Sequence, residues 1–229
     1  MRIVFMGSAD FGIPALAQCM ERGHTVCGVV TTPPRPAGRG RRLRPSPVAR
    51  WVSSQGIGPL IEPASLKDAG FIETLRGLAA DIFVVVAFRI LPPEVFSIPP
   101  HATINIHASL LPRYRGPAPI QRAIQNGDDK TGITIFRIDA GIDTGEIILR
   151  KETPIGPQET TPQLFERLSG LGARGCVEAL ELVETGKAVT KPQTGEPATK
   201  APKLHKEEAR IDWSLNAPQI FNRIRAFKP

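Results

Sequence analysis

Two polar side chains that could act together are Asn105 and His107, in the segment ATINIHASLLPRYRG. On a strand, residues two apart project from the same face, about 7 Å apart. The strand predicted here ends near Ser109, and Pro112 and Gly116 force a loop. In open α/β sheets ligands bind beyond the carboxyl ends of strands. An amide can donate to a developing oxyanion, and an imidazole can transfer protons near neutral pH. The alternative is a core histidine beside a turn-forming asparagine.

A carboxylate candidate is Asp143, in the glycine-rich segment DAGIDTGEI, where Asp139 and Glu146 are its acidic neighbours. Surface turns favour aspartate for local hydrogen bonding, which is the alternative explanation for each of the three. No spacing along the chain ties Asp143 to His107. Only the fold can bring the carboxylate to the imidazole.

Arginine is concentrated between residues 22 and 61, a stretch with no lysine and no acid. Its seven arginines equal the whole formal excess of +7. They are Arg22, Arg35, Arg39, Arg41, Arg42, Arg44 and Arg50. Guanidinium groups form bidentate contacts with phosphate, so the run favours a polyphosphate partner over a solvated charged loop. Trp51 is the one aromatic near it, which favours contact with a nucleic-acid backbone over base stacking.

The turn Gly7-Ser8-Ala9-Asp10-Phe11-Gly12 follows the first predicted strand, where a dinucleotide-binding turn would lie. It lacks the middle glycine that lets the backbone approach a pyrophosphate. The pattern therefore argues against a nicotinamide-dependent oxidoreductase.

Composition sets the broad class. The chain has 229 residues, of which 41% are hydrophobic, enough for a full core. Three cysteines without a Cys-x-x-Cys pair argue against a disulfide framework and a zinc site, and favour a reducing cytoplasm. We expect no bound metal, because the sequence contains no motif typical of a metal site. The sequence contains neither a signal peptide nor an apolar run of membrane-spanning length, so we expect no membrane partner.

The order of elements predicts an α/β fold with a Rossmann-like open, mostly parallel sheet and helices on both faces. The segment from Thr32 to Pro47 is predicted as a long loop, because it is rich in proline and glycine. Strands are predicted at 2–6, 25–31, 81–87, 102–107, 131–139 and 146–153, with 81–87 at the centre. Helices are predicted at 11–22, 47–55, 68–79, 117–126 and 161–185, the last with a possible break near Gly170 or Gly175.

The composition changes after Gly186. We predict one catalytic domain over residues 1–186, and a linker with a helix over 187–229. Residues 187–210 are rich in Lys, Thr, Pro and Glu and are expected to form an extended arm. A short strand and a helix are predicted within 211–226.

Four segments resemble the methionyl-tRNA formyltransferase family, which uses N10-formyltetrahydrofolate. PRPAGRGRRLRPSPV is similar to its basic loop, and NIHASLLPRYRGPAPIQRAI to its active-site signature. TGITIFRIDAGIDTGEI is similar to the segment with the catalytic aspartate, and KLHKEEARIDWSLNAPQIFNRIRAFKP to the linker into its second domain. The resemblance spans nearly the whole chain. It implies that the family's small C-terminal β-barrel lies outside these residues.

The resemblance implies a catalytic trio of Asn105, His107 and Asp143. It implies contacts to tetrahydrofolate from Ser109, Leu110, Leu111, Pro112, Phe88, Arg89 and Ile90. It places Arg39 at the acceptor end of the tRNA, and we extend that contact to Arg35, Arg41 and Arg42. The formyl donor would be 10-formyltetrahydrofolate, and no metal would take part. The partners implied are folate and initiator methionyl-tRNA, with the enzyme expected as a monomer.

Two alternatives stay open at this point. The same trio could formylate a small amine, such as glycinamide ribonucleotide or an amino sugar, but a small acceptor does not need the arginine run. A tRNA-binding module without catalysis would explain the arginines and leave the trio unexplained.

Overall fold

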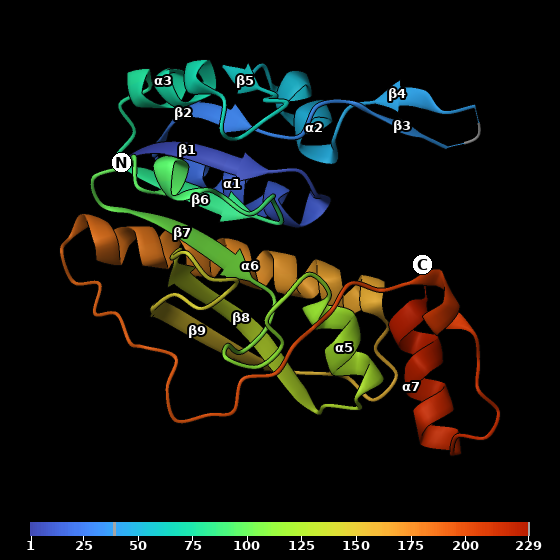
Figure 1. Cartoon of the computed structure of the whole chain (residues 1–229). Coiled ribbons are helices and arrows are strands. Elements are labelled where there is room, and N and C mark those ends of the chain that lie inside the picture. Colours follow the sequence, from blue (N-terminus) through green and yellow to red (C-terminus); the bar gives the residue numbers. More distant parts are fainter. Residues whose placement is uncertain (39, 229) are drawn as a thin grey trace.

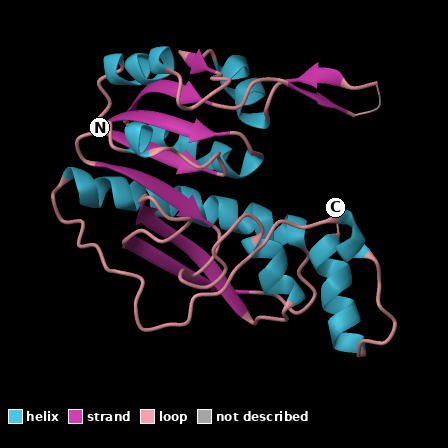
Figure 2. Cartoon of the chain, in the orientation of Figure 1, coloured by secondary structure: helices cyan, strands magenta, loops and turns pink. Residues whose placement is uncertain are grey.

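The computed structural model describes residues 1–38 and 40–228, and a seven-stranded sheet forms its centre (Figures 1 and 2). The strand order is β5-β2-β1-β6-β7-β8-β9, parallel from β5 to β7, with β8 and β9 antiparallel. The strand predicted to be central, β6, is the fourth of the seven. The bounds are β1 Arg2–Gly7, β2 Thr25–Val30, β5 Leu60–Ile61, β6 Ile82–Val86, β7 Ala102–His107, β8 Lys130–Arg137 and β9 Ile147–Pro154.

Helices cover both faces of the sheet, as Figure 1 shows. On β1, Ile3 and Phe5 belong to one buried cluster, while Val4 and Met6 belong to the other. The alternation follows from the two-residue period of a strand, and it gives the sheet two separate apolar faces. The predicted fold class, a Rossmann-like and mostly parallel sheet, is confirmed. The helices are α1 Ile13–Glu21, α2 Pro47–Gln55, α3 Ala69–Gly77, α4 Pro93–Phe96, α5 Pro119–Gln125, α6 Thr161–Glu184 and α7 Ala217–Phe227, with 3-10 turns η1 Asp10–Gly12 and η2 Lys206–Ala209.

The proline-rich segment after β2 is not only a loop. It forms an antiparallel hairpin of β3 (Arg35–Ala37) and β4 (Arg42–Arg44), which projects from the sheet in Figure 1. The turn between them uses left-handed backbone at Gly38, Gly40 and Arg41. The loop prediction was wrong here because two short strands can pair locally even when proline and glycine dominate a segment.

The long helix α6 runs without the break predicted at Gly170 or Gly175. A Cβ atom on Gly175 would lie 2.9 Å from Ile133 on β8. The glycine therefore serves close helix-to-sheet packing rather than a bend. The short strand predicted after residue 210 is also wrong, since residues 211–216 form turns before α7.

Residues 187–202, which we call the strap, return from the end of α6 along the β9 side of the sheet (Figure 1). The strap is extended, as its composition predicts, but it is bonded to the body. Lys191 exchanges two backbone hydrogen bonds with Ile147, and Ala201 donates to the Arg115 carbonyl at 2.7 Å. Within the described residues, no helix is long and apolar enough to cross a membrane.

The N-cap of α2 provides a stability test. The Ser46 hydroxyl accepts the Ala49 amide at 2.9 Å and lies 2.7 Å from the Thr31 hydroxyl, both buried. We expect Ser46→Ala to lower the free energy of unfolding by about 0.5–2 kcal/mol, because the cap is lost. Urea denaturation measures the change. Ser53→Ala, at an exposed position of the same helix, is the control, and equal effects of the two changes would contradict the cap's importance.

Candidate functional site

A cavity of about 640 Å³ opens at the carboxyl ends of the central strands. Its walls come from the β1–η1 turn, the loop after β6, the end of β7, the loop before α5 and the loop after β8. Most lining residues are apolar, and Phe11 and Phe165 meet edge to face at its side, with ring centroids 5.2 Å apart. An apolar cavity with a few convergent polar groups is typical of a small-molecule site. Those polar groups include Asn105, His107, Gln121, Asp139 and Asp143.

The Asn105 side chain lies at the cavity wall without a hydrogen bond to the described part of the protein. Its Oδ1 atom is buried and unpartnered. Its backbone is fixed in the sheet, paired with Val85 on β6 and Phe136 on β8. Burying an amide without a partner is costly, so native structures rarely do so without a function. The group is available to a ligand in the cavity.

One nitrogen of the buried His107 ring already has a hydrogen-bond partner in the protein. Nε2 lies 2.8 Å from the Tyr114 carbonyl oxygen. A carbonyl only accepts, so Nε2 must carry the hydrogen. In the neutral ring, Nδ1 is therefore the free acceptor. Nδ1 lies 3.7 Å from Asp143 Oδ2, within ion-pair range.

Asp143 reaches His107 from the loop after β8. Its Oδ2 atom accepts the Gly116 amide at 2.8 Å, and its side chain is only 14% exposed. Among the residues described, the sequence-predicted trio thus converges on one cavity, although Asn105 and Asp143 are 38 positions apart in the chain. The roles assigned to the trio remain predictions.

Three residues around the site adopt left-handed backbone although none is glycine. The φ angles are 47° at Ala87, 62° at Tyr114 and 54° at Asp143. Such residues cost about 1–3 kcal/mol each and persist where the surroundings over-determine them. Ala87 lines the cavity, while the other two contact His107 directly.

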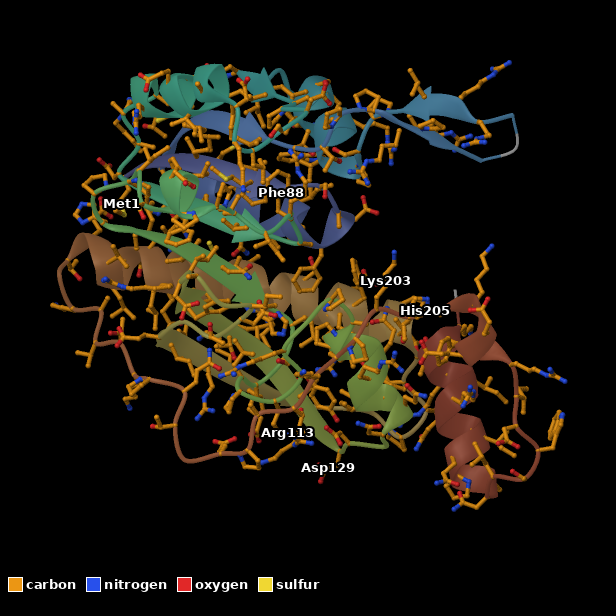
Figure 3. The ribbon with its side chains drawn as sticks, viewed as in Figure 1. Met1, Phe88, Arg113, Asp129, Lys203 and His205 are labelled. Atoms are coloured by element: carbon orange, nitrogen blue, oxygen red, sulfur yellow. The ribbon has the colours of Figure 1, made fainter. Side chains whose placement is uncertain are left out.

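The residues expected at folate divide into two groups. Phe88, Arg89 and Ile90 line the cavity, and Figure 3 labels Phe88 on the loop after β6. The four residues from Ser109 to Pro112 are not among the lining residues. The Ser109 hydroxyl donates to the Arg113 carbonyl at 2.6 Å, and the Leu111 amide donates to the Thr134 hydroxyl at 3.0 Å. These residues shape the loop that carries Tyr114 rather than the cavity wall.

The arginines of the hairpin lie together on exposed strands. Arg35 and Arg44 are directly opposite across β3 and β4, and Arg42 is exposed on β4. Like charges directly opposite each other destabilise a pair of strands. An anion bound there would offset the repulsion between Arg35 and Arg44. Burial and the positive charge of Arg35 lower the pKa of Arg89, which lines the cavity. Arg39, predicted at the tRNA, lies outside the described residues.

Sequence reasoning missed some groups at the site. Phe11 was considered only within a dinucleotide-type turn, yet it lines the cavity. Asp139 and Gln121 also line it, and Gln193 of the strap bonds to the Asp143 loop. A signal for Asp139 existed, since it shares the glycine-rich turn with Asp143. Gln193 had none, because its partners are 48–78 residues away in sequence. Over the ranges 1–38 and 40–228, no three His, Cys, Asp or Glu residues are grouped to hold a metal ion.

The fold is of the α/β class, and its cavity lies at the carboxyl edge of the sheet. Residues 1–180 match the family model described as formyl transferase, and residues 203–229 match the model of its C-terminal domain. The chain belongs to the formyl transferase family.

Curated relatives are similar over the whole chain. The methionyl-tRNA formyltransferase of Porphyromonas gingivalis is 44% identical, and the match covers all of this chain and 72% of that protein. The methionyl-tRNA formyltransferase of Stenotrophomonas maltophilia is 48% identical, with all of this chain and 75% of that protein covered.

Solved structures share the fold at low identity. WlaRD, a sugar 3N-formyl transferase determined with dTDP and 5-N-formyl-THF, has a TM-score of 0.74 at 20% identity, covering 99% of this chain and 79% of that one. HypX from Aquifex aeolicus, in complex with tetrahydrofolic acid, has a TM-score of 0.72 at 19% identity, covering 99% and 34%.

The contact between His107 and the Tyr114 carbonyl predicts one tautomer. We expect the neutral ring to carry its proton on Nε2, leaving Nδ1 free toward Asp143. The ¹⁵N chemical shifts of the labelled ring distinguish the two nitrogens, with His107→Ala used to assign the signal. A neutral ring protonated on Nδ1 would contradict the arrangement.

Proposed function

We propose that this enzyme transfers a formyl group from 10-formyltetrahydrofolate to the α-amine of initiator methionyl-tRNA, using Asn105, His107 and Asp143. The observation that carries the proposal is the convergence of an unpartnered amide, an imidazole and a carboxylate on one cavity. Relatives 44% and 48% identical are named methionyl-tRNA formyltransferase, which supports the choice of acceptor.

The reaction moves a one-carbon unit between two nitrogens. The acceptor amine attacks the formyl carbon, negative charge develops on the formyl oxygen, and the bond from carbon to N10 then breaks. Asn105 can donate to that oxygen, and removing such a donor typically costs 10²–10³-fold in rate. The donor is the Nδ2 group of the amide, and neither Nδ2 nor Oδ1 has a hydrogen-bond partner among the described residues.

Two protons must move for the transfer to balance. The amine must lose one, and N10 of the departing folate must gain one. His107 Nδ1 is the free ring nitrogen, since Nε2 is held by the Tyr114 carbonyl. It can take the proton from the amine and return it to N10. Asp143, 3.7 Å away, stabilises the imidazolium that forms between these steps, directly or through a water.

The cavity suits the folate part of the donor. Its walls near Phe88, Arg89 and Ile90 are largely apolar, and its volume of about 640 Å³ is within the usual range for small-molecule sites. The backbone of these residues follows the strained Ala87. We propose that the pterin ring binds against this wall. The loop from Ser109 to Pro112 would then support His107 from outside the cavity.

The hairpin suits the tRNA. Arg35, Arg41, Arg42 and Arg44 are exposed, and within the described ranges none of the four forms a salt bridge. The hairpin projects on the side toward which β1, β6 and β7 point, the same side as the cavity (Figure 1). A phosphate backbone held there would place the acceptor end near His107. Arg39 is included in this interface by the family resemblance.

A second candidate is an amino sugar as the acceptor, because WlaRD and other structural neighbours are named sugar N-formyltransferases. The trio would serve that reaction equally well. The arginine hairpin favours the tRNA, since a small amine would leave its charges uncompensated. A tRNA-binding module without catalysis is disfavoured by the enzyme relatives.

Removing the imidazole tests the catalytic assignment. We expect His107→Ala to lower kcat by about 10²–10⁴-fold, because general acid–base transfer is lost, while the affinity for the donor stays near wild type. Formylation of methionyl-tRNA with 10-formyltetrahydrofolate is the assay. His101→Ala, at an exposed histidine, is the matched control. Wild-type turnover by His107→Ala would refute the assignment, and an amino sugar tried as the acceptor separates the two candidates.

Neutralising the hairpin tests its binding to tRNA. We expect Arg41→Gln with Arg42→Gln to raise the KM for tRNA, and to flatten the slope of log KM against log salt by about 0.7–0.9 for each phosphate that the hairpin no longer neutralises. The control is Arg22→Gln with Arg174→Gln, which removes the same charge at exposed positions elsewhere. An unchanged salt slope in the hairpin variant would rule out phosphate binding there.

A further inference from the structure

The strap contacts both residues on which the His107 ring depends. One is Tyr114, whose carbonyl holds Nε2, and the other is Asp143, which faces Nδ1. Both adopt left-handed backbone that a non-glycine residue rarely keeps without support. An extended segment can dock on a sheet edge through backbone pairing alone, but the strap also forms hydrogen bonds with these two residues.

Thr199 accepts hydrogen bonds from the backbone amides of Tyr114 and Arg115, which flank the Tyr114 carbonyl. Its hydroxyl accepts the Tyr114 N–H at 2.8 Å, and its carbonyl accepts the Arg115 N–H at 2.9 Å. The Arg115 N–H belongs to the same peptide group as the carbonyl that accepts from His107. That group is therefore bonded on both sides, and a donor bond at its nitrogen strengthens the acceptor at its oxygen.

Gln193 supports the other partner. Its side-chain Nε2 donates to the carbonyls of Asp143 at 2.9 Å and Gly145 at 2.8 Å. Its Oε1 accepts from the Arg115 guanidinium, at 3.1 Å from Nε and 2.8 Å from Nη2. One amide thus ties the Asp143 loop to the loop that carries Tyr114.

Gly116 lies where the strap, the loop before α5 and Asp143 meet. Its N–H donates to Asp143 Oδ2, and its φ angle is 125°. A Cβ atom there would lie 2.6 Å from the Ala201 carbonyl of the strap. The strap, the loop before α5 and the Asp143 carboxylate are therefore closely fitted.

We propose that Thr199 and Gln193 are positioning residues, which act from the strap by fixing the Tyr114 carbonyl and the Asp143 carboxylate on the two nitrogens of His107. The inference rests on the proposed function for its kinetic consequences. Neither residue is among those that line the cavity. They act on the orientation of the imidazole rather than on the substrate.

The effect on orientation follows from the contacts. The Tyr114 carbonyl holds Nε2 and the Asp143 carboxylate faces Nδ1, so loosening either contact leaves the ring less firmly oriented. Among the described residues, Asp143 is the one charged group in ion-pair range of the ring, while Asp139 and Arg89 line the same cavity.

The test compares Thr199→Val, Gln193→Met and the rescue variant Thr199→Ser in the full chain. We expect Thr199→Val and Gln193→Met to lower kcat by about 10–100-fold with little change in KM, since a displaced catalytic group loses rate without losing binding. Thr199→Ser keeps the hydroxyl and should restore kcat. Thr194→Val is the matched control, because within the described ranges the Thr194 side chain makes no hydrogen bond.

A second readout does not depend on activity. The ¹⁵N chemical shifts of the His107 ring should differ from wild type in Thr199→Val and Gln193→Met, because the ring is less firmly held, and should return to the wild-type values in Thr199→Ser. Wild-type kcat and ring shifts in both variants would overturn the inference, as would a fall in kcat with unmoved ring shifts and a lower melting temperature. If wild type itself fails to formylate methionyl-tRNA, the proposed function falls, and the NMR comparison alone decides whether the strap sets the imidazole.

Discussion

The hydrogen bond from His107 Nε2 to the Tyr114 carbonyl is the contact on which the rest of the site depends. At 2.8 Å and buried, it fixes the tautomer, and therefore decides that Nδ1 is the nitrogen presented to Asp143. The bond exists because the loop after β7 turns back through a left-handed residue at Tyr114. Without that turn the imidazole would be held by one end only, and its free nitrogen would have no defined partner.

The sheet provides the rigid base for this arrangement. β7 is paired on both sides, so the backbone of Asn105 and His107 cannot rotate independently of its neighbours. The two-residue period of the strand puts both side chains on one face of the sheet, where they line the cavity. The two loops of the site, the Asp143 loop and the loop before α5, are then tied to each other by Gly116. Precision at the imidazole thus comes from one rigid strand and two mutually bonded loops.

Charge is arranged separately from chemistry. The cavity is largely apolar, whereas the arginine run stands on a hairpin away from the sheet, with Arg35 and Arg44 opposite each other. In this chain the hairpin is strongly basic, which is the physical basis for expecting a polyanionic acceptor.

The sequence alone determined the six longer strands of the sheet and most helices, because alternation, caps and glycines are local signals. It also determined that Asn105 and His107 share a face, since they lie two apart on one strand. It predicted a loop where β3 and β4 pair, and it treated the strap as a linker, because pairing partners are not encoded in composition. Only the tertiary structure brought Asp143 to His107, and Gln193 and Thr199 to the loops beside them. Those contacts join residues 36 to 85 positions apart. A periodic pattern in a sequence indicates local structure, and it does not indicate which distant residues the folded chain brings into contact.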